Sequence, residues 1–229
     1  MKLMSSEAEA HPMMPPSPSK SVPMPTCSTP MMLTMWLRCS TASRMVAGLL
    51  MTMRGTPFVY EGQEIGMTNG DFKGLDEVED IESHNIYAMA KRLGIPKGLR
   101  WKMIKRTSRD NARTPMQWTD GEGAGFTSGT PWLKINGNHK EINVERERAT
   151  EGGVLRFWQE MIKLRRSDPV LIEGDFSVLY QGRAVYAFRR TLGKRELVSV
   201  VNMSARAVKL PRVLDNCGKL RVSSESTPD

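Results

Sequence analysis

Apolar residues recur between positions 45 and 53 at intervals of three and four, a spacing that predicts a helix. Gly55 and Pro57 should end this helix, because both residues interrupt helical structure. A short apolar run at residues 58–60 follows, bounded by Pro57 and Gly62, and such a run is typical of a strand buried on both faces. A helix followed by a buried strand predicts an α/β unit with a parallel sheet.

A polar stretch of roughly ninety residues then separates Gly62 from Gly153. Residues 81–93 and 98–104 within it have the pattern of short helices, and turn-forming residues such as Asn69-Gly70 lie between them. Compact domains rarely carry so long an insertion between core elements unless it has a function. We therefore expect the chemistry of this protein in the stretch.

An amphipathic helix is predicted next, over residues 153–166, because five apolar residues fall on one face before Asp168-Pro169. Four runs of alternating apolar and polar residues follow, separated by turn signals, and they predict a small antiparallel sheet that forms a further domain. The runs cover residues 176–180, 184–190, 197–202 and 205–210.

Residues 1–42 have a different composition from the rest. They contain seven of the 14 prolines and eight of the 17 methionines. Proline lacks a backbone donor and fits neither helix interiors nor central strands, so we expect this segment to be irregular. Two explanations are open: a flexible tail, or a leader that is not native coding sequence. We favour the second, because the composition breaks abruptly near Ser43.

Charge and cysteine content exclude several classes of function. The net charge is +8, but the basic residues are spread along the chain and no nucleic-acid module is recognisable, so no nucleic-acid partner is expected. Cys27, Cys39 and Cys217 have no paired spacing, which predicts neither a disulfide framework nor a metal site. No apolar run reaches the length of a membrane span and no secretory signal is apparent, so we expect a cytoplasmic protein without a membrane partner.

Several motifs in the polar stretch carry a resemblance. Residues 54–67 read RGTPFVYEGQEIGM, residues 78–83 read VEDIES and residues 108–118 read SRDNARTPMQW. With shorter matches further along, they resemble the oligo-1,6-glucosidase and trehalose-6-phosphate hydrolase group of alpha-amylase-type glycoside hydrolases. The resemblance runs from Ser43 to about residue 211.

The resemblance implies an α/β plus all-β fold, in which the strand at residues 56–60 is the last of a (β/α)8 barrel. The expected organisation is an irregular leader at 1–42, the C-terminal portion of the barrel at 43–168 with a long loop after its last strand, and an antiparallel β domain at 169–229. Function in such barrels lies in loops of this kind. No cofactor is implied, and the oligomeric state stays open.

The mechanism that the resemblance implies is retaining glycoside hydrolysis, which requires a nucleophilic carboxylate and a carboxylic acid about 5 Å apart. In the family both lie upstream of the position that matches Ser43. Residues 1–42 offer only Glu7 and Glu9 as carboxylates. We therefore assign no catalytic residue in this chain. Glu61 and Glu64 follow the predicted last strand but do not occupy the family's catalytic positions.

Substrate-binding residues are implied by motif position. Arg109 resembles the arginine that contacts hydroxyls of the glucose unit being cleaved, although an ion pair with Asp110 or a neighbouring carboxylate is the alternative. Glu82 resembles the residue that accepts hydrogen bonds from the next sugar, with Asn85 as a helper, although Asp80 and Glu82 also suit the N-terminus of a helix. We expect Trp118 and Trp132 to be core residues of the loop rather than sugar platforms.

Three functions fit these residues. The first is part of a retaining α-glucosidase acting on α-1,6 or α-1,4 bonds of short oligosaccharides, inactive as this chain. The second is part of a trehalose-6-phosphate hydrolase, for which Lys102, Lys105 and Arg106 offer cations near the site. The third is a carbohydrate-binding module that does not cleave its ligand. A small oligosaccharide is the expected partner in the first and third.

Overall fold

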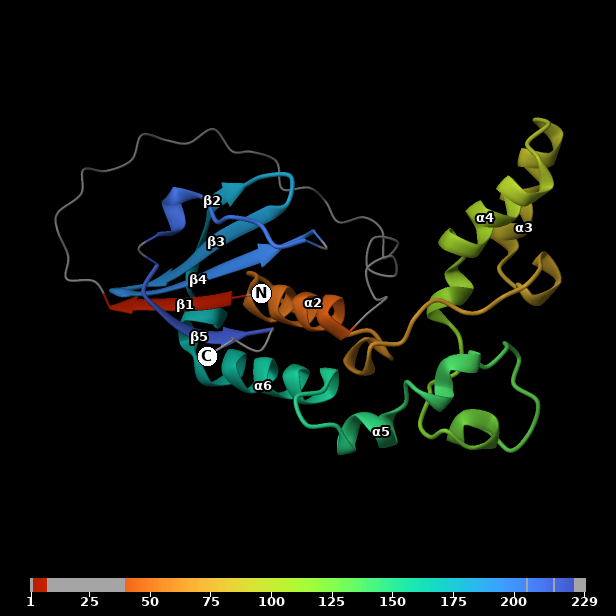
Figure 1. The fold of residues 1–229 in the computed structure, drawn as a ribbon, viewed down its shortest axis with the longest axis horizontal. Helices are drawn as coiled ribbons and strands as arrows, with labels where there is room; N and C mark the ends of the chain where they lie inside the picture. Colours follow the sequence, from red (N-terminus) through yellow and green to blue (C-terminus); the bar gives the residue numbers. More distant parts are fainter. Residues whose placement is uncertain (1, 8–39, 205, 216, 225–229) are drawn as a thin grey trace. The chain divides into compact units, whose positions relative to one another are not determined.

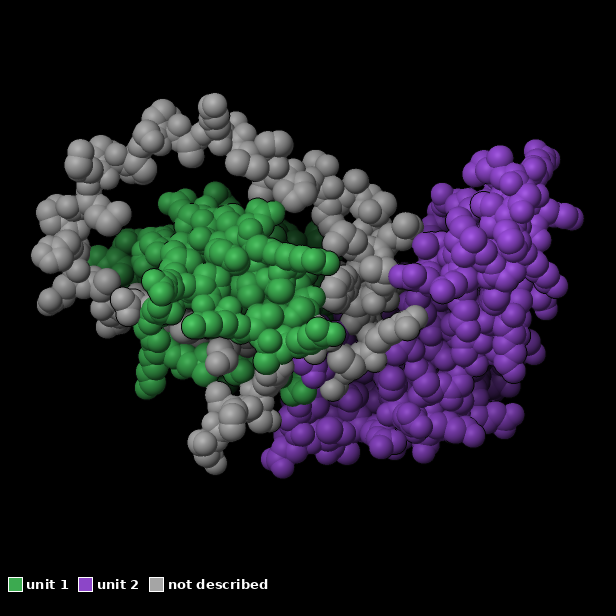
Figure 2. Space-filling model, turned by 45° about the horizontal axis from the view of Figure 1, so that its top comes forward, with its two compact units in different colours: residues 1–28, 44–58, 157–229 green, residues 29–43, 59–156 purple. Residues whose placement is uncertain are grey.

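A computed structural model describes residues 2–7, 40–204, 206–215 and 217–224 of the chain. It divides into two compact units (Figure 2). We call the unit of residues 1–28, 44–58 and 157–229 the sheet unit, and the unit of residues 29–43 and 59–156 the loop unit. The domain division expected at residues 168–169 stays a prediction.

A five-stranded antiparallel sheet forms the centre of the sheet unit, in the order β2-β3-β4-β1-β5 (Figure 1). Three of the predicted strands are confirmed. Successive side chains of β3 and β4 point to opposite faces of the sheet, and both faces are covered. The strands are β1 (Lys2–Glu7), β2 (Asp175–Gln181), β3 (Val185–Leu192), β4 (Arg195–Asn202) and β5 (Lys219–Ser223).

The prediction that the whole N-terminal segment is irregular is wrong for its first residues. Lys2–Glu7 forms β1, which pairs antiparallel with β4 on one side and β5 on the other. The first proline of the chain is Pro12, so nothing in residues 2–7 prevents them from making ladder hydrogen bonds. Residues 8–39 of the predicted leader, including Cys27 and Cys39, lie outside the described residues.

The strand predicted at residues 205–210 is also wrong. Residues 206–210 form no strand, and Ala205 lies outside the described residues. The edge of β4 away from β3 is already paired with β1, so this segment has no edge of β4 to join. Its apolar residues Val208 and Leu210 pack instead on the cluster of Val185, Ala187, Val198, Val200 and Leu214, which covers one face of the sheet.

The predicted helices of this part of the chain are confirmed as α2 (Ser40–Thr52) and α6 (Val154–Ser167). A short helix, α7 (Pro169–Ile172), follows, with Asp168 as its N-cap and proline in the first turn. Val170 and Leu171 of α7 are buried against Leu197 of β4. The opposite face of the sheet is therefore covered by helix.

Two arginines bind the carboxyl end of α2. Arg165 of α6 donates from Nη1 to the carbonyl oxygens of Met51 and Met53 at 2.8 and 3.0 Å. Arg190 of β3 donates from Nη1 to the carbonyl oxygen of Thr52 at 3.1 Å. The last carbonyls of a helix lack partners within it and carry partial negative charge, so two guanidinium groups satisfy and stabilise this end.

Residues 56–60, expected as a buried barrel strand, form no strand. Phe58 is 83% exposed, and Val59 and Tyr60 are also exposed. A parallel strand needs a neighbour on at least one edge, and among the described residues no strand pairs with this run. The prediction that this run is a buried strand is therefore wrong for this chain.

The loop unit contains α3 (Ile81–Arg92), α4 (Lys97–Thr107) and α5 (Val144–Ala149), of which the first two were predicted. Two small apolar clusters support it. Ile65, Met116 and Val144 form the first cluster, and Phe72, Val78 and Leu133 form the second, with Trp101 packed on it. None of the helices in the described part of the chain is both long and apolar enough to cross a membrane.

Candidate functional site

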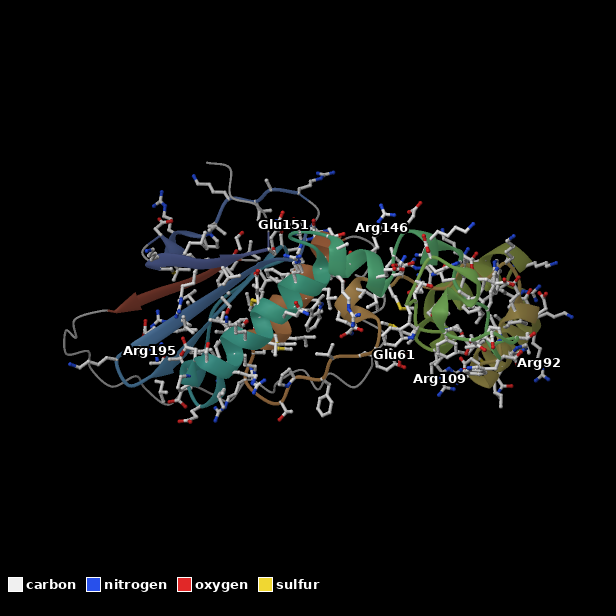
Figure 3. All side chains as sticks on the ribbon, turned by 90° about the horizontal axis from the view of Figure 1, so that it is seen from below. Glu61, Arg92, Arg109, Arg146, Glu151 and Arg195 are labelled. Carbon is white, nitrogen blue, oxygen red and sulfur yellow. The ribbon has the colours of Figure 1, made fainter. Side chains whose placement is uncertain are left out.

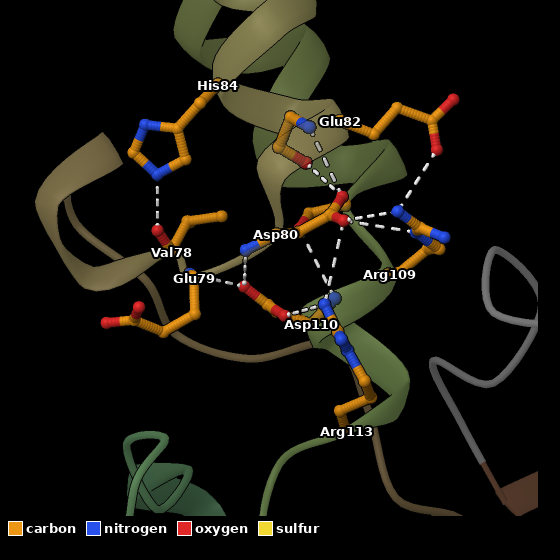
Figure 4. A network of polar contacts seen from close by, with 10 residues as sticks. Val78, Glu79, Asp80, Glu82, His84, Arg109, Asp110 and Arg113 are labelled. Atoms are coloured by element: carbon orange, nitrogen blue, oxygen red, sulfur yellow. Dashed lines mark hydrogen bonds and ion pairs between the residues drawn. The ribbon is translucent and has the colours of Figure 1, made fainter.

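Asp80 lies at the centre of a polar network at the start of α3 (Figure 4). It is the N-cap of the helix, and its Oδ2 accepts hydrogen bonds from the backbone N–H and the hydroxyl of Ser83 at 3.3 and 2.7 Å. Its Oδ1 accepts from Nε and Nη2 of Arg109 at 3.1 and 2.8 Å. The side chain of Asp80 is 3% exposed, so this ion pair has one buried partner.

Asp110 lies beneath this pair and is fully buried. Its Oδ2 accepts hydrogen bonds from the backbone N–H groups of Glu79 and Asp80 at 2.7 and 2.9 Å. Its other oxygen accepts from Nη2 of Arg113. The carboxylate of Asp110 therefore fixes the backbone at Glu79 and Asp80, and the side chain of Asp80 in turn fixes Arg109.

Arg109 is the exposed member of the network. Its side chain is 61% exposed and stands at the surface of the loop unit (Figure 3). Both donors that bind Asp80 lie on one edge of the guanidinium, and within the described residues Nη1 has no hydrogen-bond acceptor. A planar group held on one edge keeps its remaining donors in a fixed direction. Such a group is suited to binding hydroxyl or anionic oxygens.

Hydrogen bonds and burial shift the pKa of Asp80 in opposite directions. Burial raises the pKa of its carboxyl group, but the hydrogen bonds from Ser83 and Arg109 and the charge of Arg109 outweigh it, so the pKa lies below the ordinary value. The same pairing raises the pKa of Arg109. Asp80 is therefore ionised throughout the neutral range.

The lowered pKa of Asp80 predicts a pH dependence of stability. A carboxylate with a lowered pKa in the folded state stabilises the fold above its unfolded pKa of about 3.9, and this contribution is lost as pH falls through the folded pKa. We expect Asp80→Asn to reduce the loss of loop-unit stability below about pH 4. Urea unfolding of both proteins, followed at the amides of α3 by hydrogen exchange, measures the difference. Identical pH profiles would contradict the assignment.

The other two predicted binding residues lie on α3. Glu82 is exposed, and its Oε2 is 3.4 Å from Nη2 of Arg109. Asn85 is exposed one turn further along and takes part in none of the hydrogen bonds of this network. The structure thus brings Glu82 and Arg109 together, whereas Asn85 lies on the same helix without a hydrogen bond to either. Their role in binding sugar is a prediction that the geometry leaves open.

Sequence reasoning missed the importance of Asp80 and Asp110. Asp80 was recognised only as a residue that suits a helix start, and Asp110 as one possible partner of Arg109. The partner is instead Asp80, 29 positions earlier in the chain. The available signal was the pair of acidic motifs, VEDIES and SRDN, each with an aspartate beside a predicted binding residue.

The loop around the site is fixed by polar side chains. Gln117 is fully buried, and its Nε2 donates to Oδ1 of Asn138 and to the carbonyl oxygen of Ile142 at 3.1 and 2.6 Å. Asn138 donates to Oγ1 of Thr68 at 2.8 Å, and Asn136 donates to the backbone carbonyl of Asn69 at 3.0 Å. Gln117 of the SRDNARTPMQW motif is thus fixed to the segment at residues 138–142, and Asn136 and Asn138 join that segment to Asn69 and Thr68, which lie 67 and 70 positions earlier in the chain.

The two tryptophans expected in the core of the loop are exposed, so that prediction is wrong. Trp118 is 46% and Trp132 is 60% exposed. The two buried apolar clusters of the loop unit consist instead of smaller side chains, Ile65, Met116 and Val144 in one and Phe72, Val78 and Leu133 in the other. The guanidinium of Arg113 lies over the ring of Trp132, 5.6 Å from its centroid. This contact joins Trp132 to the network and leaves most of its surface exposed beside it.

Two further carboxylates lie at the start of the loop unit. Glu64 follows Gly62 in a short 3-10 turn, and burial raises the pKa of its carboxyl group. Glu61, labelled in Figure 3, is exposed. In the part of the chain that the structure describes, no three His, Cys, Asp or Glu side chains are grouped in a way that would bind a metal.

Comparison with known proteins gives the family. Residues 29–174 match the model of the alpha amylase catalytic domain. The oligo-1,6-glucosidase of Halalkalibacterium halodurans is 39% identical over 166 residues, 72% of this chain and 30% of that protein. The trehalose-6-phosphate hydrolase of Escherichia coli is 37% identical over 164 residues, 71% of this chain and 30% of that protein.

A solved structure agrees with these relatives. The isomaltulose synthase of Klebsiella is 42% identical and superposes with a TM-score of 0.68 over 72% of this chain and 30% of its own. The chain thus spans about 30% of the length of the curated relatives it matches, in their C-terminal part. With a family model covering more than half of the chain, this protein belongs to the alpha-amylase catalytic-domain family of glycoside hydrolases.

Proposed function

We propose that this chain is the C-terminal part of a retaining α-glucosidase that acts in the cytoplasm on α-1,6 or α-1,4 bonds of short oligosaccharides. The observation that carries the proposal is the guanidinium of Arg109, which the buried Asp80 holds on one edge, while the side chain is 61% exposed and Nη1 has no hydrogen-bond acceptor among the described residues. Hydroxyls of a glucose unit are acceptors that such a group binds in a fixed direction.

Glu82 and Trp132 complete the proposed sugar site. Glu82 contributes an exposed carboxylate 3.4 Å from Arg109, which can accept hydrogen bonds from a neighbouring sugar hydroxyl. Trp132, which contacts Arg113, offers an exposed aromatic face of the kind on which the apolar face of a pyranose ring packs. Asn85 remains a helper through its position on α3.

The chain by itself is expected to hydrolyse no glucoside. Retaining hydrolysis needs a nucleophile and an acid in fixed positions, and neither is assigned in this sequence. Removing them removes the chemical step itself rather than slowing it. The binding role of Arg109 is therefore best measured where the missing residues are supplied.

A chimera with a relative supplies the missing nucleophile and acid. We expect an oligo-1,6-glucosidase from Halalkalibacterium halodurans that carries residues 59–156 of this chain in place of its own matching segment to hydrolyse isomaltose. Arg109→Ala in the chimera should lower kcat/KM roughly 10- to 100-fold, because the charged hydrogen bonds from the guanidinium to the sugar hydroxyls are lost. Steady-state kinetics with isomaltose measure the change.

Arg146→Ala is the matched control for this chimera, since Arg146 is an exposed arginine of the same unit on α5. It should leave kcat/KM within twofold. Equal activity of the Arg109→Ala and Arg146→Ala chimeras would refute the binding role. Turnover of an aryl α-glucoside by this chain alone, abolished by Arg109→Ala, would refute its expected inactivity.

Trehalose-6-phosphate hydrolysis is the second candidate. It is favoured by the exposed cations Lys102 and Lys105 of α4, the helix that leads into Arg109. A phosphosugar would place its anionic group near such cations. A chimera that prefers trehalose 6-phosphate to isomaltose would establish this candidate in place of the first. Saturable binding of isomaltose by the chain without turnover in any chimera would instead favour a carbohydrate-binding module.

A further inference from the structure

The hairpin of α3 and α4 is rich in lysine and arginine, and Lys91, Arg92 and Lys97 flank its turn. Between Glu82 and Asp110 the sequence has eight lysines and arginines and no acidic residue. The two helices pack against each other, so that cations distant in the sequence gather on one element (Figure 1). Arg92, labelled in Figure 3, lies at the end of α3, and Lys97 begins α4 after a short turn.

These cations are available to a partner. The side chains of Lys91, Arg92, Lys97 and Lys102 are exposed, and no carboxylate of the described residues forms an ion pair with any of them. Their positive potential is therefore not neutralised locally, and an anionic surface would be attracted to this end of the hairpin.

Large apolar side chains stand among the cations. Leu93, in the turn, is 72% exposed, and Leu99 of α4 is 51% exposed. Met89 of α3 and Met103 of α4 are 57% and 40% exposed. Ala90 of α3 and Ile104 of α4 are buried, whereas these four apolar side chains lie on the exposed faces of the two helices and in the turn. Aliphatic side chains between lysines and arginines are typical of elements that lie in a membrane interface.

We propose that the α3–α4 hairpin docks on an anionic phospholipid surface. The cations would bind lipid phosphates, and Leu93 and Leu99 would enter the boundary between headgroups and acyl chains. A nucleic-acid backbone offers phosphates to the same cations but nothing to these leucines, which is why we favour lipid. Surface docking needs no membrane-spanning helix, and the proposal differs on this point from the expectation from the sequence that no membrane partner exists.

Sedimentation with vesicles tests the proposal. The full chain should bind vesicles of phosphatidylcholine with one third phosphatidylglycerol and leave pure phosphatidylcholine vesicles unbound. The double variant Arg92→Gln/Lys97→Gln should lower the partition coefficient roughly 20-fold, since each cation near such a surface contributes about fivefold. Leu93→Gln/Leu99→Gln, which keeps the charge, should lower it at least tenfold.

A charge-matched control separates this site from the net charge of +8. Arg183→Gln/Lys194→Gln removes two exposed cations of the sheet unit and should change the partition coefficient by less than twofold. An equal loss in this control, or no binding to anionic vesicles, overturns the proposal. So does a duplex DNA that binds more tightly than the vesicles and is indifferent to the leucine substitutions, because that result identifies a phosphate-backbone site.

Discussion

Replacing Arg190 with methionine is expected to lower the free energy of unfolding of the sheet unit by about 3–5 kcal/mol. The guanidinium of Arg190 is fully buried and donates to the carbonyl oxygens of Thr52, Leu171 and Gly174, at distances of 2.8 to 3.2 Å. Its loss leaves three carbonyls without this donor, each at a cost of roughly 1–3 kcal/mol. The desolvation of a buried charge, which methionine avoids, offsets part of that sum.

The electrostatic setting of Arg190 explains how a cation can be buried there. Burial lowers the pKa of the guanidinium, as do the charges of Arg165 and Arg54, and within the described residues no carboxylate forms an ion pair with it. The carbonyls at the ends of α2 and α7 carry the compensating negative potential. A lysine cannot reach three carbonyls with the same planar set of donors, so Arg190→Lys should recover only part of the stability.

Arg189→Met is the matched control, because Arg189 precedes Arg190 on β3, is 38% exposed and pairs with Glu196 at 3.2 Å. It should cost less than 1 kcal/mol. Hydrogen exchange at the amides of β3 and β4 measures the sheet unit separately from the loop unit. Equal exchange rates in the two methionine variants would show that the buried arginine does not stabilise the carboxyl end of α2.

Elements whose signal is local could be predicted from the sequence. The helices α2, α3, α4 and α6 and the strands β2, β3 and β4 follow from periodicity, since a helical stripe or an alternating run is fixed by the residues within it. Errors arose where structure depends on a distant partner. β1 forms because β4 and β5 provide two edges, and residues 56–60 stay out of any sheet because no described strand is next to them.

At the site, too, local features could be predicted from the sequence, whereas contacts with distant residues could not. The SRDNARTPMQW motif indicated Arg109, because motif position transfers single residues. It did not show that Arg109 binds Asp80, since that pair spans 29 positions and depends on how the loop folds. Nor did it show that Trp118 and Trp132 are exposed, because the size and low polarity of an indole by themselves favour burial.

Asp110→Ala is expected to lower the free energy of unfolding of the loop unit by about 2–4 kcal/mol, because it leaves the buried backbone N–H of Asp80 and the partly buried N–H of Glu79 without this acceptor. Hydrogen exchange at the amides of α3 measures the loss. Asp110→Asn keeps one acceptor oxygen for both N–H groups but turns its amide donors toward Arg113, so it should cost about half as much.

Asp120→Ala, at an exposed aspartate of the same loop, is the control for this prediction and should cost less than about 0.5 kcal/mol. The ordering of the three variants is the informative result. If Asp110→Ala costs no more than Asp120→Ala, the backbone beneath Asp80 is fixed by other contacts. If the ordering holds, Asp110 sets the direction of Arg109 through Asp80, although Asp110 itself contacts no ligand. A substitution at Asp110 should then weaken sugar binding in the chimera even though Arg109 is intact.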